Sequence, residues 1–215
     1  KVYAMNTGII FDMDGTLWDS SEEVAEAWTE IAIKHPTAGR RFTASDMQSL
    51  MGKTMDDIAR ISFPSLPKEE REALLDECCA NENDYLLRNG AKLTPGLEDT
   101  LKILSEDYPL FIVSNCQSGY IEAFLSHYGF EDYFEDIECY GNNNLLKEDN
   151  IRLIADRNGL ESFYYVGDTL LDYESCKNAG GIFIHAAYGY GTVPEGTPYI
   201  ESLSKLPETL KGLTR

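Results

Sequence analysis

The chain has 215 residues, a formal net charge of −19 at pH 7 and a hydrophobic fraction of 43%. This length fits one large domain or a domain with a sizeable insertion, and the apolar content is enough for a core. The charge argues against nucleic acid and anionic membrane surfaces as partners because both would repel it, but it leaves room for a small anionic substrate. No apolar run approaches the roughly 20 residues that span a bilayer, and no signal-peptide pattern opens the chain.

The five cysteines do not form a framework of paired positions. Cys78 and Cys79 are adjacent, and no two of the five have the spacing of a CxxC pair. We therefore expect reduced thiols that mostly pack in the interior of a cytoplasmic protein, rather than disulfides or a zinc site.

The first predicted element is a strand that ends in an acidic loop. Ile9, Ile10 and Phe11 form the short apolar run of a buried parallel strand, and Asp12 and Asp14 follow it directly. A carboxylate at the end of a buried strand is costly to desolvate, and two such groups repel each other. A bound metal ion or a shared proton would resolve the repulsion, and an ordinary acidic turn is the alternative.

A helical region follows this strand. Ser20 and Glu23 have the spacing of a capping box and predict a helix start, and the longest helix is expected from about Lys68 to Arg88. No strand-like alternation is present between them. The sequence therefore predicts a helical cap domain over residues 18–90, inserted into a core made of residues 1–17 and 91–215.

Strands alternate with helices after the cap. The expected strands are 109–113, 137–140, 163–166 and 182–184, the last being the final strand. This order predicts an α/β fold with a doubly wound parallel sheet and helices on both faces. Ligands bind at the carboxyl ends of the strands in such sheets.

Polar residues gather at three of these strand ends. They are Asp12 and Asp14, Ser114 and Asn115, and Gly167 and Asp168. Carboxylates and carbonyls without nearby His or Cys favour a hard cation, and Mg²⁺ is the natural choice. An anion beside these acids also needs a positive group. Lys147 is the best candidate, as the single lysine between Lys102 and Lys177, although a solvated surface lysine is the alternative.

Four motifs in order resemble those of the haloacid dehalogenase superfamily. They are Asp12–Leu17 (DxDGT), Ser114, Lys147, and Gly167–Thr169 with Asp172 (GDTxxD). The resemblance is to hydrolases of the branch whose helical cap follows the first strand, among its phosphoglycolate phosphatase-like members. It covers nearly the whole chain.

The resemblance implies a Mg²⁺-dependent phosphatase that hydrolyses a small phosphate monoester through an aspartyl phosphate. Asp12 would be the nucleophile and Asp14 the general acid and base, with Lys147 as the third catalytic residue. The metal ligands would be Asp12, the Asp14 carbonyl and Asp168. Substrate-binding residues would be Ser114, Asn115, Lys147, Gly15 and Thr16, with Thr169 and Asp172 in support.

The chain departs from the family pattern after Lys147. Glu148, Asp149 and Asn150 follow it where the family usually has prolines, and these acids compete for the lysine. Arg152 is the alternative cation.

The resemblance also separates the possible reactions. Asp14 argues for phosphoryl transfer, because the dehalogenases of the family lack a carboxylate at this position. A sugar phosphomutase of the family is disfavoured, since its cap histidine would align with Val24. A non-catalytic phosphate-binding regulatory protein is the other alternative.

Substrate identity stays open between phosphoglycolate, sugar phosphates and nucleoside monophosphates. Gly52 and Lys53 of the cap are candidates for specificity, and Trp18 would either stack on a ring or pack at the junction of the cap and the core. The expected partner is a small phosphorylated metabolite, and the expected assembly is a monomer or dimer.

Overall fold

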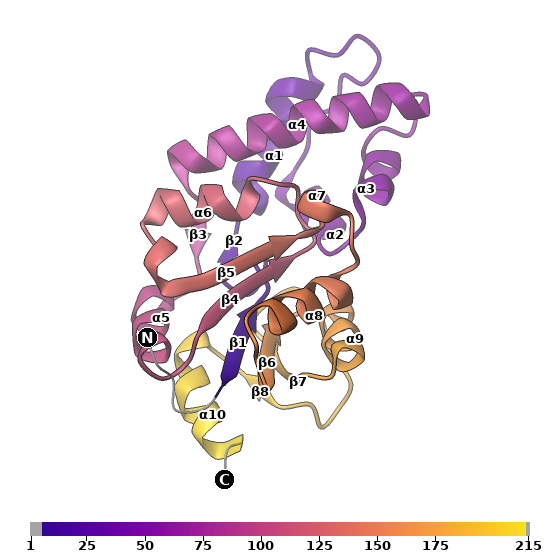
Figure 1. Ribbon diagram of the computed structural model, residues 1–215. Helices are drawn as coiled ribbons and strands as arrows, with labels where there is room; N and C mark the ends of the chain where they lie inside the picture. The colour runs from indigo at the N-terminus through magenta and orange to yellow at the C-terminus, as the bar shows by residue number, and fades with distance from the viewer. Residues whose placement is uncertain (1–5, 214–215) are drawn as a thin grey trace.

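The computed structural model describes residues 6–213, and a six-stranded parallel sheet lies at its centre (Figure 1). The strand order is β5-β4-β1-β6-β7-β8. These strands are β1 (Thr7–Phe11), β4 (Leu110–Ser114), β5 (Phe134–Cys139), β6 (Ser162–Gly167), β7 (Ile182–Ala186) and β8 (Tyr199–Ile200). The direction of winding reverses on either side of β1, so the carboxyl ends of β1, β4 and β6 meet at a topological switch point. The predicted α/β class with a doubly wound parallel sheet is confirmed.

Helices cover both faces of the sheet, as Figure 1 shows. One face packs against α5 (Leu97–Asp107), α6 (Tyr120–Tyr128) and α10 (Leu206–Leu213), and the other against α8 (Lys147–Arg157) and α9 (Leu170–Ala179). Within β1, Ile9 and Phe11 belong to the first interior cluster and Ile10 to the second. Successive side chains of a strand point to opposite faces, so an unbroken apolar run suits a strand that is covered on both sides.

Four helices form the region between β1 and the rest of the sheet. They are α1 (Ser21–Ala32), α2 (Ala44–Leu50), α3 (Met55–Ser62) and α4 (Lys68–Asn89). The chain enters this region through β2 (Trp18–Asp19) and leaves it through β3 (Lys92–Leu93), and these two short strands pair antiparallel. The two chain segments that connect the helical region to the sheet therefore lie side by side.

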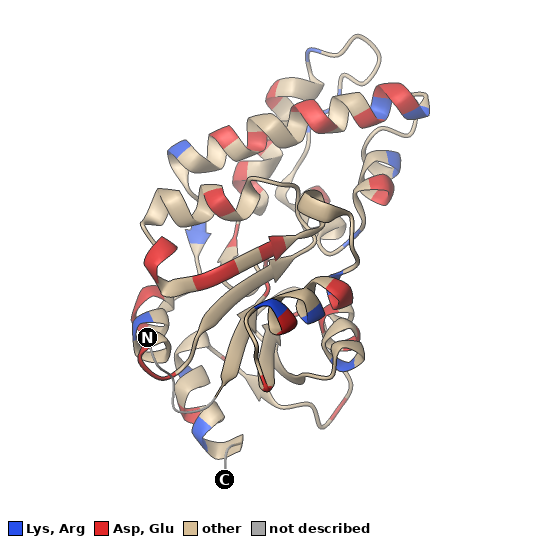
Figure 2. Ribbon diagram, viewed as in Figure 1, with Lys and Arg blue, Asp and Glu red and all other residues tan. Residues whose placement is uncertain are grey.

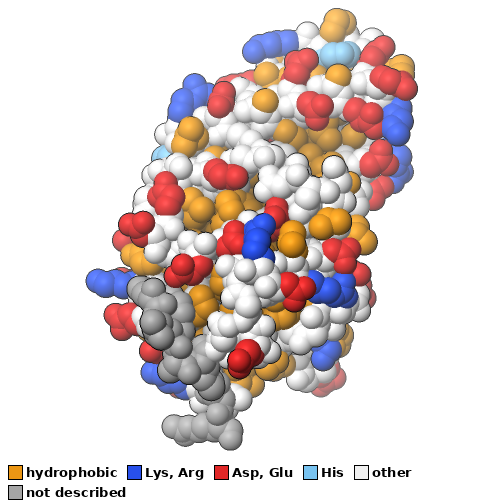
Figure 3. Space-filling view, in the orientation of Figure 1, with side chains coloured by type: hydrophobic (Ala, Val, Ile, Leu, Met, Phe, Trp, Pro, Cys, Tyr) orange, Lys and Arg blue, Asp and Glu red, His pale blue; other side chains and the backbone are white. Residues whose placement is uncertain are grey.

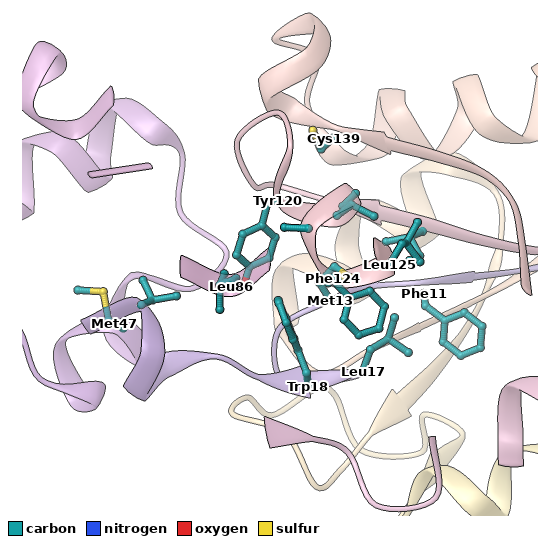
Figure 4. Close-up of a cluster of buried hydrophobic side chains, with 14 of the residues drawn as sticks. Phe11, Met13, Leu17, Trp18, Met47, Leu86, Tyr120, Phe124, Leu125 and Cys139 are labelled. Carbon is teal, nitrogen blue, oxygen red and sulfur yellow. The ribbon is translucent and has the colours of Figure 1, made fainter. Parts of the chain in front are cut away.

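The helical region and the sheet share one hydrophobic cluster, part of which Figure 4 shows. Trp18 is fully buried there, with its ring centroid 5.4 Å from that of Tyr120 and 4.9 Å from that of Phe124. Leu86 of α4 belongs to the same cluster. Trp18 thus packs at the junction and does not offer a ring to a ligand.

Three sequence expectations about these elements were wrong. Ser20 is the N-cap residue of α1, but its side chain makes no capping hydrogen bond, so the expected box with Glu23 does not form. The strand over 182–184 is not the last, because β8 follows and pairs with β7. Strand β5 starts at Phe134 rather than near Ile137. Two-residue strands and strands with many acids carry little apolar pattern for a sequence to reveal.

Short elements complete the fold: α7 (Tyr140–Asn143), η1 (Glu131–Tyr133) and η2 (Leu203–Lys205). All five cysteines are free thiols in the part of the chain that the structure describes. Within residues 6–213, no helix has the length and apolar character needed to cross a membrane. Acidic side chains are spread among basic ones on the face in Figures 2 and 3, which shows no continuous basic patch.

Candidate active site

Lys147 joins two carboxylates beneath the end of β1. Asp12 follows β1 directly, Lys147 is the first residue of α8, and Asp172 lies in the first turn of α9. The Lys147 Nζ atom is 2.8 Å from Asp12 Oδ1 and 2.6 Å from Asp172 Oδ1, and the lysine is only 4% exposed. It is therefore a buried group of the site and not a solvated surface lysine.

The acids that follow Lys147 do not draw it away. Asp149 instead pairs with Arg152, whose Nη1 atom is 2.7 Å from Asp149 Oδ1. Arg152 also donates to the Asn178 carbonyl, and its side chain is partly exposed. The alternative cation therefore lies outside the cluster that Lys147 completes.

Charge and burial oppose each other in this cluster. Burial alone would lower the pKa of Lys147, but the charges of Asp12 and Asp172 outweigh it and hold that pKa well above its usual value. Burial raises the pKa of Asp12, and Asp172 raises it further against the opposite effect of Lys147. The lysine is thus firmly an ammonium group, whereas the carboxylates lack enough positive charge around them.

Asp168 adds a third carboxylate to this place. It follows β6, it is fully buried, and its Oδ2 atom accepts the Tyr190 N–H at 2.6 Å. Its Oδ1 atom has no hydrogen-bond partner among residues 6–213. Burial, followed by the charge of Asp172, raises the pKa of Asp168 to about 7.

These residues fit a divalent metal ion. Oxygen atoms of Asp12, Asp168 and Asp172 all lie within 4.8 Å of one another. Three carboxylates and the Lys147 ammonium sum to a charge of about minus two, and a buried oxygen without a partner suits a hard cation.

Asp172 is less suited than the other two to hold the metal. Its Oδ1 atom accepts from Lys147, and its Oδ2 atom accepts from the Thr169 amide at 2.9 Å and the Thr169 hydroxyl at 2.7 Å. Thr169 is the N-cap residue of α9 and forms a capping box with Asp172. Both oxygens of Asp172 are therefore occupied in fixing the helix start and the lysine.

Asp14 lies in a different environment from Asp12. Its Oδ1 atom accepts hydrogen bonds from Ser20 Oγ at 2.8 Å and from Tyr120 Oη at 2.6 Å, and the two hydroxyls are 2.7 Å apart. Burial raises the pKa of Asp14, against the lowering effect of these two hydrogen bonds. The sequence did not reveal Tyr120 as part of the site, because it reaches Asp14 across 106 positions.

The backbone amides of Gly15 and Thr16 form hydrogen bonds within the turn after Asp14. The Gly15 amide donates to the Trp18 carbonyl at 2.9 Å, and the Thr16 amide donates to the Met13 carbonyl at 3.1 Å. Thr16 is fully buried, and its hydroxyl has no partner within residues 6–213. Their role as substrate-binding residues stays a prediction. The amides of Met13 and Asp14 are the remaining candidates in this loop.

The backbone geometry of the turn explains why a glycine stands at position 15. Its φ angle is +79°, and a Cβ atom there would clash with Asp168 Oδ2. A side chain would therefore strain the turn and push against Asp168. The glycine lets the acidic loop and the end of β6 approach closely.

Ser114 and Asn115 face the same space from the end of β4. Ser114 is buried, and the Asn115 side-chain amide donates to the Gly52 carbonyl of the cap at 3.4 Å. The Asn115 Oδ1 atom has no partner among the described residues. Asn115 therefore links the strand end to the loop that holds Gly52 and Lys53.

One cavity brings the strand ends and the helical region together. It measures about 710 Å³ with the solvent at its mouth included. From the sheet side it is lined by Asp12, Asp14, Ser114, Asn115, Cys116, Gln117, Tyr120, Lys147 and Thr169. From the helical side it is lined by Val24, Trp28, Met47, Leu50, Met51, Gly52, Lys53, Met55, Ile58 and Glu82. The site residues that were predicted outside the helical region thus line this cavity, except for Gly15, Thr16, Asp168 and Asp172.

Relatives of known name match most of the chain in sequence. Phosphoglycolate phosphatases from Escherichia coli and Vibrio vulnificus are 26% and 27% identical to it, with 85% of this chain covered in each case. The matches cover 82% and 84% of those proteins.

Solved structures have the same fold. A haloacid dehalogenase-like hydrolase from Bacteroides fragilis aligns with a TM-score of 0.78 at 24% identity, covering 94% of this chain and 99% of the other. A haloacid dehalogenase-like family protein from Streptococcus pneumoniae aligns with a TM-score of 0.73 at 22% identity, covering 96% and 98%. The family model for haloacid dehalogenase-like hydrolases matches residues 9–186. The chain belongs to the haloacid dehalogenase-like hydrolase family.

Proposed function

We propose that the protein hydrolyses a small phosphate monoester with the help of Mg²⁺ and through a phosphorylated Asp12. The observation that carries this proposal is the placement of two carboxylates with different surroundings at one cavity. Asp12 faces the Lys147 ammonium, whereas Asp14 accepts from two neutral hydroxyls. The names of the curated relatives support the same class of reaction.

The first step needs an ionised nucleophile and a proton for the leaving group. The Lys147 ammonium opposes the burial that raises the pKa of Asp12, and a bound Mg²⁺ would also favour the ionised carboxylate. An Asp12 oxygen forms a bond to phosphorus as the bond to the leaving oxygen breaks. Asp14 gives its proton to that oxygen, and the burial that raises its pKa favours the protonated form beforehand. Lys147 and Ser114 would contact the phosphate oxygens.

The second step reverses the role of Asp14. After the first step Asp14 is ionised, and it can accept a proton from a water molecule that attacks the phosphorus of the Asp12 phosphate. Inorganic phosphate leaves, and Asp12 is free again. Ser20 and Tyr120 hold the Asp14 carboxylate in place during both transfers.

Asp12, Asp168 and the Asp14 carbonyl would hold the metal ion. When bound, Mg²⁺ offsets the negative charge on the transferring phosphoryl group. Asp172 positions Lys147 and caps α9 rather than binding the ion.

A phosphomutase is the weaker alternative. Val24 lines the cavity at the position where that subgroup would have a histidine, and an isopropyl group cannot transfer a proton to a sugar hydroxyl. A binding protein without catalysis is also weaker, because the residues for nucleophilic attack and proton transfer are all present at the cavity.

The decisive measurement is phosphate release from a panel of small phosphate monoesters, with Mg²⁺ and with a chelator. We expect hydrolysis with Mg²⁺ alone, and a loss of at least about a thousand-fold in kcat for Asp12→Asn, because the nucleophile is removed. A single turnover with radiolabelled substrate, quenched in acid, should leave label on the wild type and none on Asp12→Asn.

Asp156→Asn is the matched control, since Asp156 is exposed on α8 away from the cavity. It should keep the wild-type kcat. Turnover that ignores the chelator, or full activity of Asp12→Asn, would sink the mechanism.

A further inference from the structure

Glu82 is a buried acid at the cavity that the proposed mechanism does not use. It lies in the middle of α4, it is 5% exposed, and it lines the cavity together with the catalytic residues. The Trp28 indole N–H of α1 donates to its Oε2 atom. Its position is outside the loop of Gly52 and Lys53, where specificity was expected from the sequence.

Hydrogen bonds to Glu82 from the protein leave capacity for a ligand. Trp28 donates one, and the Gln117 side chain also stabilises the charged form of the group. An ionised carboxylate can accept about four hydrogen bonds across its two oxygens. A ligand in the cavity can therefore add a hydrogen bond without displacing Trp28.

The surroundings of Glu82 are mostly apolar. Val24, Met47, Leu50, Met55 and Ile58 line the helical side of the cavity. Glu82 and Lys53 are the only charged residues that line this side within the described chain. A ligand that enters here meets hydrocarbon surface with one buried acceptor.

Resting on the proposed function, we infer that Glu82 selects substrates whose leaving group carries a hydrogen-bond donor, a hydroxyl or an ammonium, and selects against leaving groups that end in a carboxylate. The carboxylate of such a substrate would meet a second buried carboxylate, and two like charges out of water repel strongly. A donor would instead form a hydrogen bond to a charged acceptor, which is among the stronger kinds.

Lys53 does not compensate for Glu82. It lines the same cavity, but its side chain is exposed, where an ion pair with a substrate contributes little. Glu82 is close enough to Asp14 for the charge of Asp14 to raise the pKa of Glu82, after the larger effect of burial. The two acids therefore line the same cavity, and neither offers positive charge to a substrate carboxylate.

Three esters on the same two-carbon skeleton test this selection: phosphoethanolamine, hydroxyethyl phosphate and phosphoglycolate. At about pH 8, above the Glu82 pKa of about 7, the wild type should have a higher kcat/KM for the first two than for the third. Glu82→Gln should reduce each of these two ratios about ten-fold or more, since its amide can donate to a carboxylate. The order of the ammonium and hydroxyl esters tells the two kinds of donor apart.

Glu77→Gln is the matched control, because Glu77 is exposed on the same helix and does not line the cavity. It should leave both ratios as in the wild type. If Glu82 had only a structural role, Glu82→Gln would change the stability and lower kcat/KM for all three esters together, and the two kcat/KM ratios would stay the same.

The outcomes separate the two proposals. A wild type that hydrolyses these esters but prefers phosphoglycolate overturns the selection by Glu82, whether or not Glu82→Gln folds. A preference for the hydroxyl and ammonium esters that is lost in Lys53→Met also overturns it, because Lys53 would then determine the preference. Ratios that stay unchanged in a folded Glu82→Gln also overturn it. A wild type that hydrolyses none of the monoesters overturns the phosphatase proposal, and the selection with it.

Discussion

Asp12 and Asp14 are two residues apart and burial raises the pKa of both, yet different groups surround the two carboxyls. A buried ammonium 2.8 Å from Asp12 favours the carboxylate form. Asp14 has only the neutral hydroxyls of Ser20 and Tyr120, and burial raises its pKa. Pairs of acids with such different environments divide the nucleophilic and proton-transfer roles of a reaction between them.

Tyr120→Phe tests the positioning of Asp14. The change removes one hydroxyl that donates to Asp14 and contacts Ser20, while the buried ring stays in its cluster. A hydrogen bond to a charged group contributes about 1.5–3 kcal/mol, so we expect kcat to fall about ten-fold or more with little change in KM. Steady-state kinetics at saturating Mg²⁺ measure both constants.

Tyr173→Phe is the control for this prediction. Tyr173 lies on α9 with its ring against Phe183 and does not line the active-site cavity. It should retain the wild-type kcat. If Tyr120→Phe also retained it, with an unchanged melting temperature, Tyr120 would have no part in positioning Asp14.

Glu82 makes stability depend on pH. Burial raises its pKa from 4.5 to about 7, so the folded chain keeps a proton that the unfolded chain has already lost over that interval. The contribution of this group to the free energy of unfolding therefore falls as pH rises from about 4.5 to about 7. The full loss corresponds to about 3 kcal/mol.

Glu82→Gln cannot titrate and should escape this loss. The free energy of unfolding of the variant minus that of the wild type should rise by about 3 kcal/mol between about pH 4.5 and about pH 8. Denaturant unfolding at both pH values measures the difference, and other titrating groups cancel in it. A difference independent of pH would mean that Glu82 titrates as it does in the unfolded chain.

The sequence predicts the side chains at strand ends better than the contacts between them. Asp12 and Ser114 line one cavity, as their positions after two strands indicated, and Lys147 joins them from the start of α8. Tyr120 and Glu82 also lie there, but both come from helices whose apolar periodicity says nothing about which polar side chain points inward. Their partners are far away in sequence, so no local pattern reveals them.

At the scale of elements, apolar runs and helix stops were the reliable signals. The predicted long helix from about Lys68 to Arg88 corresponds to α4, which spans Lys68–Asn89. The Ser20 capping box failed although its spacing was right. Its hydroxyl contacts Asp14 and Tyr120 instead, and a tertiary contact of a buried hydroxyl outweighs a local one.

Helix α4 is tied to the sheet end as well as to its neighbours. The Asn83 side chain donates to the Ser118 carbonyl at 2.8 Å and accepts from Gln117 at 3.0 Å. These bonds come from the residue next to Glu82 and reach the loop that follows Ser114 and Asn115. The bonds therefore fix the part of α4 that carries Glu82 relative to the strand end that carries Ser114 and Asn115.

At the scale of the whole molecule, the net charge of −19 and the chemistry of the site are compatible because the charges are separated. Acids and bases are mixed on the face that Figure 3 shows, and water screens them there. Lys147 is buried among three carboxylates, where screening is weak. A net negative chain can thus still hold a phosphate dianion, provided a divalent cation completes the site.

This balance predicts that Mg²⁺ stabilises the folded chain without any substrate. Binding to the folded state alone, at a hundred times Kd, adds about 2.7 kcal/mol, which corresponds to a rise in Tm of about 5–10 °C for a chain of this size. Asp168→Asn should abolish the rise, because it removes a ligand whose Oδ1 atom has no partner in the described chain.

The Asp168→Asn variant should nevertheless melt above the wild type when Mg²⁺ is absent. It removes one charge from a buried group with a sum of about minus two, and its amide oxygen can still accept the Tyr190 N–H. Thermal melts with and without Mg²⁺ check both changes, with Asp156→Asn expected to respond as the wild type does. A Mg²⁺-dependent rise that survives in Asp168→Asn would place the ion elsewhere.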